Sequence, residues 1–372
     1  MGASALGRGG RSARVGIGAT LRLIMLSYQL VQYGQALKPA ELTPPAPVGT
    51  EVLLQVDACG VCHSDLHLYD GFFNLGGDKR LDLSKGRKLP LTLGHEIAGR
   101  VVACGAEAVG VEVGAQRVVY PWIGCRDCQT CAEGYEHLCA RTRALGVSRH
   151  GGFSDHVVVP HPRYLLEFGN RPATLASTYA CSGLTAYGAV RKVQSRVSGR
   201  PLVIIGVGGV GFAALRLAQA VTTADVIALD VNDVTLQAAA ETGAAVVDAR
   251  ADDAAKQIRT LTGGGAAAAI EFVGAGSTAS LGFKALGTGG LLVIVGLFGG
   301  RLETSLPLWP LRSLTVQGSY VGSLDEMREL MRLVESGAVL PIPIQPRPLS
   351  DAQAVLNDLR DGRALGRMVL TP

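Results

Sequence analysis

Short apolar segments separated by turn residues run through most of the chain, and their pattern changes near residue 175. Before that point, SYQLVQYG, EVLLQVDACG and GGFSDHVVVP predict short strands joined by polar loops. After residue 199, near-continuous apolar segments such as LVIIGVGGVG and ADVIALD alternate with helical patterns. Strands that are apolar on both faces are typical of parallel sheets covered by helices on both sides. The pattern therefore predicts two regions of different architecture.

The second region contains six candidate strands, which predict a doubly wound parallel sheet. Beyond the first two, the candidates are AAVVDA, AAAAIEFVG, GGLLVIVG and SLTVQGS. A helix is expected over TLASTYACSGLTAYGAV, two amphipathic helices around 325–336 and 350–360, and a last strand in RMVLTP. The first region is predicted to be all-β and rich in loops, with its polar motifs on those loops.

Composition limits the partners that need to be considered. Of 372 residues, 48% are hydrophobic and 18% are charged, which suits a globular chain long enough for two domains. The formal charge of +4 comes from four arginines in residues 1–24, and the other 31 basic and 31 acidic residues balance. We therefore expect no nucleic acid and no anionic membrane as a partner. The apolar runs are short and broken by glycine, so no secretory signal or membrane span is predicted.

The first 24 residues have two interpretations. An Arg-rich, acid-free start is typical of an organelle transit peptide. The favoured alternative is a dispensable extension ahead of a start at Met25. Eight cysteines that are mostly clustered indicate metal ligands rather than disulfides, and the expected location is the cytoplasm.

Four of the cysteines form one close cluster. Cys125, Cys128, Cys131 and Cys139 have the spacing C-x2-C-x2-C-x7-C. Four thiolates this close can surround a tetrahedral ion and leave no open position for a substrate. An iron–sulfur cluster is the alternative, but its usual spacings differ. We therefore predict a structural zinc ion.

A second group of polar residues lies in CHSDLH, which begins at Cys62, and in GHE, which contains His95. Cys59 and Cys62 form a C-x-x-C pair, but a redox pair of the thioredoxin type would open a helix after a strand of a βαβ unit. A catalytic zinc ion instead requires three protein ligands and one exchangeable position. Cys62, His95 and Cys181 could supply these ligands from three segments, although spacing alone does not show that they converge.

A glycine-rich turn follows the first strand of the second region. Gly206-Val207-Gly208-Gly209-Val210-Gly211 fits G-x-G-x-x-G between a strand and a helix, as in dinucleotide-binding folds. Asp230 ends the next strand, where a carboxylate can accept hydrogen bonds from the adenosine ribose and repel a 2′-phosphate. We predict NAD rather than NADP. The alternative is a structural turn with no ligand.

Together these segments resemble a known family. CGVCHSDLH, LPLTLGHEIAG, the four-cysteine cluster, ACSGLTAYGAV and VIIGVGGVG occur in the order found in zinc-dependent alcohol dehydrogenases of the medium-chain dehydrogenase/reductase superfamily. The resemblance covers residues 25–372, and the insertion after Phe73 and the PWIGC segment are most similar to tetrameric bacterial and archaeal members. It implies a GroES-like catalytic domain (25–178 and 321–372) with a structural zinc lobe (122–140), and an NAD-binding Rossmann domain (179–320).

The resemblance also implies roles for single residues. Cys62, His95 and Cys181 become the ligands of the catalytic zinc ion. Ser64 takes the proton of the alcohol and His67 passes it to solvent, while Asp65 orients the histidine ligand and Glu96 lies just behind the metal. Cys59 is expected to be a packed thiol. The residues expected to bind the cofactor are His63, Thr185, Gly206, Gly208, Gly209, Val210, Gly211, Asp230, Val295, Gly296 and Leu297.

The implied activity is the reversible oxidation of primary and secondary alcohols to aldehydes and ketones, with hydride transfer to NAD. Two zinc ions per chain and a homo-oligomer, either a tetramer or a dimer, are expected with it. A zinc-free enone or quinone reductase of the same fold and a non-catalytic NAD-binding protein are the alternatives. Trp122, the insertion of 74–90 and the segment after residue 295 are expected to shape the substrate pocket, and their chemistry favours an apolar alcohol.

Overall fold

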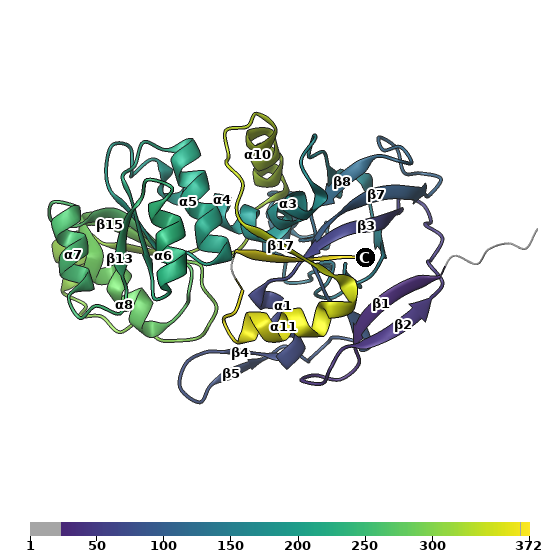
Figure 1. Cartoon of the computed structure of the whole chain (residues 1–372), viewed down its shortest axis with the longest axis horizontal. Coiled ribbons are helices and arrows are strands. Elements are labelled where there is room, and N and C mark those ends of the chain that lie inside the picture. The colour runs from purple at the N-terminus through teal and green to yellow at the C-terminus, as the bar shows by residue number, and fades with distance from the viewer. Residues whose placement is uncertain (1–23, 365) are drawn as a thin grey trace, which may run out of the picture.

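The computed structural model describes residues 24–364 and 366–372, which form a β-rich part and a part built on a parallel sheet (Figure 1). The predicted fold class is therefore confirmed. The two interpretations of residues 1–24 concern residues that, except for Ile24, lie outside the described part of the chain. The domain limits given above stay predictions.

A seven-stranded sheet forms the centre of the β-rich part, in the order β10-β8-β7-β3-β18-β17, with β9 also paired to β3. Its strands are β3 (Val52–Gly60), β7 (Glu96–Cys104), β8 (Gln116–Val119), β9 (His156–Val159), β10 (Leu165–Leu166), β17 (Ile344–Pro348) and β18 (Arg367–Thr371). Because β18 pairs with β3, the end of the chain returns to its first part (Figure 1). The smaller strands are β1 (Met25–Leu30), β2 (Lys38–Leu42), β4 (Phe72–Asn74), β5 (Arg80–Asp82) and β6 (Leu91–Thr92).

The register of three strands decides where the polar motifs lie. The antiparallel pairing of β3 with β7 places Gly60, the last residue of β3, opposite Glu96, the first residue of β7. β18 pairs Val369 with the same Gly60. The residues just after β3, just before β7 and at the start of β18 therefore meet at one end of the sheet.

The second part is a six-stranded parallel sheet in the order β13-β12-β11-β14-β15-β16. Its strands are β11 (Leu202–Ile205), β12 (Val226–Asp230), β13 (Ala245–Asp248), β14 (Ala266–Glu271), β15 (Leu286–Ile294) and β16 (Thr315–Gly318). Helices α5 (Gly209–Val221), α6 (Asp233–Ala240), α7 (Ala254–Leu261), α8 (Gly276–Ala285) and α9 (Leu308–Arg312) connect them. All six predicted strands are present.

The apolar character of these strands has a direct structural reason. Along β11, Leu202 and Ile204 pack into one apolar cluster, while Val203 and Ile205 pack into a second. All four are at most 1% exposed. Successive side chains of a strand point to opposite faces, so both faces of this strand are covered. The first cluster also contains residues of the β-rich part, so one core is continuous between the two parts.

One expectation about the polar motifs is wrong. Residues 63–70 form helix α1 (His63–Asp70) rather than a loop, because Cys62 and Asp65 make a reciprocal capping box that starts a helix. The insertion after Phe73 contains one short strand, β5. Its strand β5 pairs with β4 to form a hairpin.

The helix expected over residues 174–190 is divided into three pieces. It consists of α3 (Ala173–Thr178), a π-helical turn (Tyr179–Gly183) and α4 (Leu184–Gln194). Such turns insert an extra residue and occur often at functional sites. The remaining helices are α2 (Gln129–Ala132), α10 (Leu324–Glu335) and α11 (Ala352–Arg360), and the last two confirm the amphipathic helices predicted near the end of the chain.

The β4–β5 hairpin reaches from the β-rich part to the loop after β15. An added Cβ on Gly76 would lie 3.0 Å from the backbone of Gly300, and one on Gly299 would lie 2.5 Å from the carbonyl oxygen of Asn74. Arg301 also donates a hydrogen bond to the Gly76 carbonyl at 3.4 Å. The two parts therefore touch through backbone here.

None of the helices within residues 24–364 and 366–372 has both the length and the apolar character needed to cross a bilayer.

One buried hydrogen bond gives a test of this packing. The phenol of Tyr120, which is fully buried, donates to the carbonyl oxygen of Gly322 at 3.0 Å. The Tyr120→Phe change removes the donor and leaves a buried acceptor, so we expect the free energy of unfolding to fall by about 1–2 kcal/mol, measured by denaturant titration. Tyr33→Phe is the matched control, because the buried Tyr33 hydroxyl has no hydrogen-bond partner among the described residues. An equal fall in the free energy of unfolding in both variants would contradict a stabilising role of the hydrogen bond from Tyr120 to Gly322.

Candidate active site

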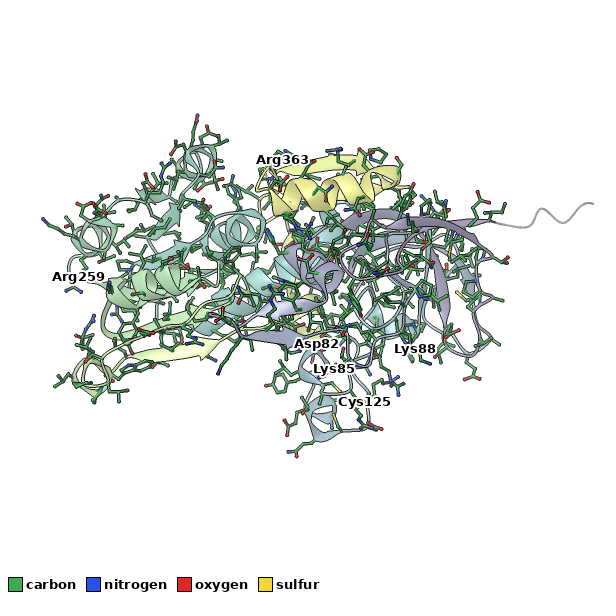
Figure 2. All side chains as sticks on the ribbon, turned by 90° about the horizontal axis from the view of Figure 1, so that it is seen from below. Asp82, Lys85, Lys88, Cys125, Arg259 and Arg363 are labelled. Carbon is green, nitrogen blue, oxygen red and sulfur yellow. The ribbon has the colours of Figure 1, made fainter. Side chains whose placement is uncertain are left out.

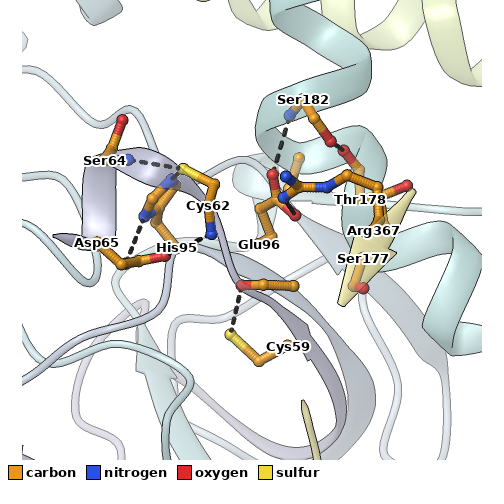
Figure 3. A network of polar contacts seen from close by, with 12 residues as sticks. Cys59, Cys62, Ser64, Asp65, His95, Glu96, Ser177, Thr178, Ser182 and Arg367 are labelled. Atoms are coloured by element: carbon orange, nitrogen blue, oxygen red, sulfur yellow. Dashed lines mark hydrogen bonds and ion pairs between the residues drawn. The ribbon is translucent and has the colours of Figure 1, made fainter. Parts of the chain in front are cut away.

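Three side chains from separate segments converge at the end of the seven-stranded sheet. The ligand atoms of Cys62, His95 and Cys181 all lie within 4.8 Å of one another, and all three residues are buried. The Cys62 Sγ is 3.1 Å from the His95 Nε2 (Figure 3). The structure thus brings together the residues whose convergence the spacing alone left open.

The local fold explains why these residues meet. Cys62 follows β3 and His95 precedes β7, so the β3–β7 register places them side by side. Cys62 is also the N-cap of α1, and its Sγ accepts a hydrogen bond from the Ser64 N–H at 3.3 Å. Cys181 comes from the π-helical turn, which lies against β7 and β8.

Asp65 fixes the direction of the histidine ring. Its fully buried carboxylate accepts hydrogen bonds from the Cys62 N–H at 3.0 Å and the Gly94 N–H at 3.2 Å. Its Oδ1 also lies 3.2 Å from the His95 Nδ1. The other ring nitrogen, Nε2, therefore faces Cys62. Burial lowers the pKa of His95, but the charges of Cys62 and Asp65 outweigh it and raise that pKa well above its ordinary value.

The pKa values of the two thiols of this cluster are shifted in opposite directions. A hydrogen bond from Cys181 holds the pKa of Cys62 well below its ordinary value, and the same contact raises the pKa of Cys181 well above its own. Two sulfur atoms and one imidazole nitrogen are a ligand set that zinc takes in sites with three protein ligands and an open position. A dication bound there would stabilise both thiolates, so these residues fit the metal.

A buried ion pair lies directly behind this cluster. Glu96 is fully buried, and its carboxylate accepts hydrogen bonds from the Ser182 N–H at 3.0 Å and the Arg367 guanidinium at 2.5 Å (Figure 3). Burial raises the pKa of Glu96 above its ordinary value, although the charge of Arg367 opposes this. Gly60 leaves room for the pair, since a Cβ there would lie 1.9 Å from the Glu96 Oε2. Glu96 therefore lies behind the cluster as a member of an ion pair with Arg367.

Sequence reasoning missed Arg367. It lies 271 residues from Glu96 and belongs to no motif, so only the pairing of β18 with β3 reveals it. The residue is 4% exposed and its Nε has no hydrogen-bond partner among the described residues. An added Cβ on Gly209 would lie 2.5 Å from its Cδ, so the arginine also reaches the glycine-rich turn.

Ser64 and His67 lie one turn apart on α1, so they share a face of the helix. His67 packs against the ring of Phe73 with 4.7 Å between the ring centroids. Burial and the neighbouring His63 lower the pKa of His67 below its ordinary value. The imidazole is therefore neutral near pH 7 and able to accept a proton.

One cleft joins these residues to the parallel sheet. It has a cavity volume of about 350 Å³ and is lined by Cys62, Ser64, His67 and Cys181, and also by every residue expected to bind the cofactor. Asp65, His95 and Glu96 are fully buried and do not line it. The cleft wall also includes residues that the sequence analysis did not name, among them Phe272, Val273, Ser319, Tyr320 and Arg367.

The glycines of the turn have distinct surroundings. An added Cβ on Gly211 would lie 1.9 Å from the Gly206 carbonyl oxygen, so this glycine permits close packing of helix on strand. Gly206 has a positive φ of 81°. A Cβ added on Gly208 would meet no other atom within 4 Å, which leaves room for a ligand next to the backbone of this glycine.

Asp230 ends β12 and lines the cleft. Its carboxylate accepts hydrogen bonds from the backbone N–H groups of Val207 at 2.8 Å, Val231 at 2.8 Å and Asn232 at 3.0 Å. The carboxylate therefore ties the glycine-rich turn to the end of the next strand. A carboxylate has about four lone-pair sites, so it retains acceptor capacity toward the cleft.

Trp122 belongs both to the core and to the wall of the cleft. It is 4% exposed, and its indole N–H donates to the Ala180 carbonyl at 3.0 Å, so it belongs to the core. It also lines the cleft, with its ring 5.2 Å from that of His95 and 5.8 Å from that of Tyr320. Trp122 and Tyr320 thus form an aromatic wall beside the candidate metal site.

The four-cysteine cluster is a second candidate metal site, on a lobe that protrudes from the body of the protein (Figure 2). Its sulfur atoms are 3.5 to 3.9 Å apart in the closest pairs, too far for disulfides. Four sulfurs bound to one zinc ion at about 2.3 Å in a tetrahedron would be separated by about 3.8 Å. Burial raises the pKa of Cys139, but hydrogen bonds from the backbone N–H groups of Cys125 and Arg141 outweigh this effect and lower that pKa to about 7. The cluster therefore fits zinc.

Comparison with known proteins gives one consistent result. Residues 49–169 match the family model of the alcohol dehydrogenase GroES-like domain, and residues 209–336 match that of the zinc-binding dehydrogenases. The chain is 39% identical to an NAD-dependent alcohol dehydrogenase of Sulfurisphaera tokodaii and 38% identical to one of Saccharolobus solfataricus, in each case over 94% of this chain and the whole length of that protein. The crystal structure of the alcohol dehydrogenase of Aeropyrum pernix superposes with a TM-score of 0.84 at 32% identity, covering 93% of this chain and all of that one. The chain therefore belongs to the zinc-binding alcohol dehydrogenases of the medium-chain dehydrogenase/reductase superfamily.

Proposed function

We propose that this protein is an NAD-dependent zinc alcohol dehydrogenase that reversibly oxidises primary and secondary alcohols to aldehydes and ketones. One observation carries the proposal: Cys62, His95 and Cys181 converge beside the same cleft that the glycine-rich turn and Asp230 line. A reacting carbon held near the three ligands would therefore lie within the cleft that receives the cofactor. The complete ligand set counts against a zinc-free reductase of the same fold.

The chain would hold two zinc ions, one at Cys62, His95 and Cys181 and one at the four-cysteine cluster. Zinc at the first site supplies Lewis-acid polarisation of the alcohol oxygen, and NAD supplies the hydride acceptor. Asp65 keeps the His95 Nε2 directed at the site. Glu96 holds the Ser182 N–H, next to Cys181, and so fixes the position of that ligand.

The proton of the alcohol would leave along α1. The Ser64 hydroxyl lines the cleft next to Cys62 and is placed to accept this proton. His67 lies one turn further along the same face, and its lowered pKa keeps it neutral and ready to pass the proton outward. Both members of this proton path, Ser64 and His67, thus belong to a single short helix.

Arg367 would bind the negative charge of the cofactor. It is a buried guanidinium that lines the cleft and contacts Gly209 in the glycine-rich turn. The turn opens helix α5, whose N-terminus also favours phosphate. The guanidinium of Arg367 and the N-terminus of α5 would then both face the pyrophosphate of the cofactor.

The substrate and the assembly follow from apolar surfaces. Trp122 and Tyr320 line the cleft beside His95, which favours an apolar alcohol. Leu306 and Leu311, beside the edge strand β16, are 79% and 78% exposed, which supports a homo-oligomer.

The cysteines must stay reduced to bind zinc, which supports a cytoplasmic location.

The ligand set can be tested by removing one ligand. His95→Ala should abolish alcohol oxidation and reduce bound zinc from two ions per chain to one, measured by metal analysis, because two sulfurs hold zinc poorly. Binding of NADH, followed by fluorescence, should persist. Cys59→Ala is the control, since Cys59 is buried three residues from Cys62 and lies outside both cysteine clusters. A His95→Ala enzyme that keeps two zinc ions and its turnover would refute the site.

The proton path makes a prediction about pH. His67→Gln should lower kcat at least about tenfold, since a positioned proton acceptor contributes about 10²–10⁴-fold. Because only neutral His67 accepts the proton, kcat of the wild-type enzyme should fall as the pH drops below about 6.5, through the lowered pKa of His67. The variant should lack this fall, and added imidazole should restore part of its rate. An unchanged pH profile would count against the relay.

Cofactor preference tests Asp230. Asp230→Asn keeps an oxygen for the backbone N–H groups but removes the charge that repels a 2′-phosphate. We expect kcat/KM for NADP, relative to NAD, to rise about tenfold or more, since bonds to a charged group contribute about 1.5–3 kcal/mol. Asp225→Asn, at the opposite end of the same strand and exposed, is the control. A preference that does not move would exclude this role.

A further inference from the structure

Glu271 is a buried carboxylate that the proposed chemistry does not use. It is the last residue of β14 and is fully buried. No basic side chain of the described residues pairs with it. An uncompensated buried charge is costly, so its neighbours must supply hydrogen bonds.

The donors come almost entirely from the turn that follows the strand. The Glu271 Oε1 accepts hydrogen bonds from the backbone N–H groups of Val273 and Gly274, both at 2.8 Å, and from the Thr278 hydroxyl at 2.8 Å. The Oε2 accepts a further bond from the Gly274 N–H at 2.9 Å. Burial raises the pKa of Glu271, and these hydrogen bonds oppose that rise.

This turn lies between the two loops that line the cofactor cleft. On one side, an added Cβ on Gly206, in the glycine-rich turn, would lie 2.5 Å from the Val273 Cγ2. On the other, an added Cβ on Gly296 would lie 2.0 Å from the Gly274 N. The turn is therefore packed directly against both loops.

Hydrogen bonds join the same turn to the loop after β15. The Glu271 carbonyl accepts from the N–H groups of Val295 at 2.8 Å and Gly296 at 3.1 Å, and the Val273 carbonyl accepts from the Phe298 N–H at 3.1 Å. The Gly299 N–H donates to the Gly274 carbonyl at 3.0 Å. The position of residues 295–299 thus depends on how the peptide groups of Val273 and Gly274 are turned.

We infer that Glu271 is a positioning residue for the cofactor: by holding the N–H groups of Val273 and Gly274, it sets the distance between the glycine-rich turn and residues 295–299. The inference rests on the proposed use of NAD in this cleft. A carboxylate is suited to the task because both of its oxygens accept, so one side chain can orient two consecutive peptide groups.

A purely structural role, as a cap of helix α8, fits the contacts less well. Glu271 receives a single bond from that helix, from the side chain of Thr278, and the helix N-cap is Ala275. Both backbone donors precede the helix. The carboxylate therefore orders the turn more than it caps the helix.

The test compares Glu271→Ala, Glu271→Gln and Thr278→Val with the wild-type holoenzyme. We expect Glu271→Ala to raise the Kd for NADH and the KM for NAD about tenfold, with a smaller effect on kcat and with two zinc ions still bound. Glu271→Gln should recover part of the loss, because its one oxygen can still accept from both N–H groups. Thr278→Val removes one donor and should weaken NADH about threefold; it serves as the test if Glu271→Ala does not fold.

Hydrogen exchange gives a readout that does not depend on activity. In the cofactor-free variants, amide protection should fall in residues 272–276 and 295–299 and stay unchanged in the seven-stranded sheet. Glu303→Gln, an exposed carboxylate on the loop after β15, is the control and should change neither readout. Variants that melt earlier but keep the wild-type Kd for NADH and the wild-type exchange in 295–299 would overturn the positioning role. A wild-type enzyme that binds no NADH would instead overturn the proposed function, and the inference with it.

Discussion

The buried ion pair between Glu96 and Arg367 is the contact on which the site depends. It joins the first residue of β7 to the first residue of β18, which lie 271 residues apart, and it receives a third segment through the Ser182 N–H. A candidate metal ligand therefore precedes each of two members in the chain, His95 before Glu96 and Cys181 before Ser182. Removing one partner of a buried pair leaves an unpaired charge and typically costs about 3–5 kcal/mol. The pair thus holds in register the strands that present the metal ligands.

Local sequence patterns predicted the parts of the structure whose causes are local. The strands of the parallel sheet were predictable because both of their faces are covered, as for β11, and the glycine-rich turn because Gly211 must pack against Gly206. The four-cysteine lobe was predictable because its ligands lie within 15 consecutive residues. In each case the residues that decide the structure are close in sequence.

Patterns failed where the cause lies far away or in a single side chain. The start of α1 depends on a cysteine acting as N-cap, which is an unusual residue for that position. The π-helical turn at Cys181 interrupts a continuous helical pattern, and it places that cysteine beside Cys62 and His95, which lie far away in the sequence. Arg367 and Glu271 have no motif at all, and their importance follows only from what surrounds them after folding.

The exposed β4–β5 hairpin limits how the sequence can evolve. Its first strand supplies Phe73, which supports the ring of His67, and its tip contacts the loop that continues from the cofactor wall. Insertions and deletions usually accumulate in exposed hairpins because they disturb little. Here a change of length would shift both His67, the proposed proton acceptor, and the loop after β15 that lines the cleft. The two halves of the site can therefore diverge only together, although the segment that joins them lies at the surface.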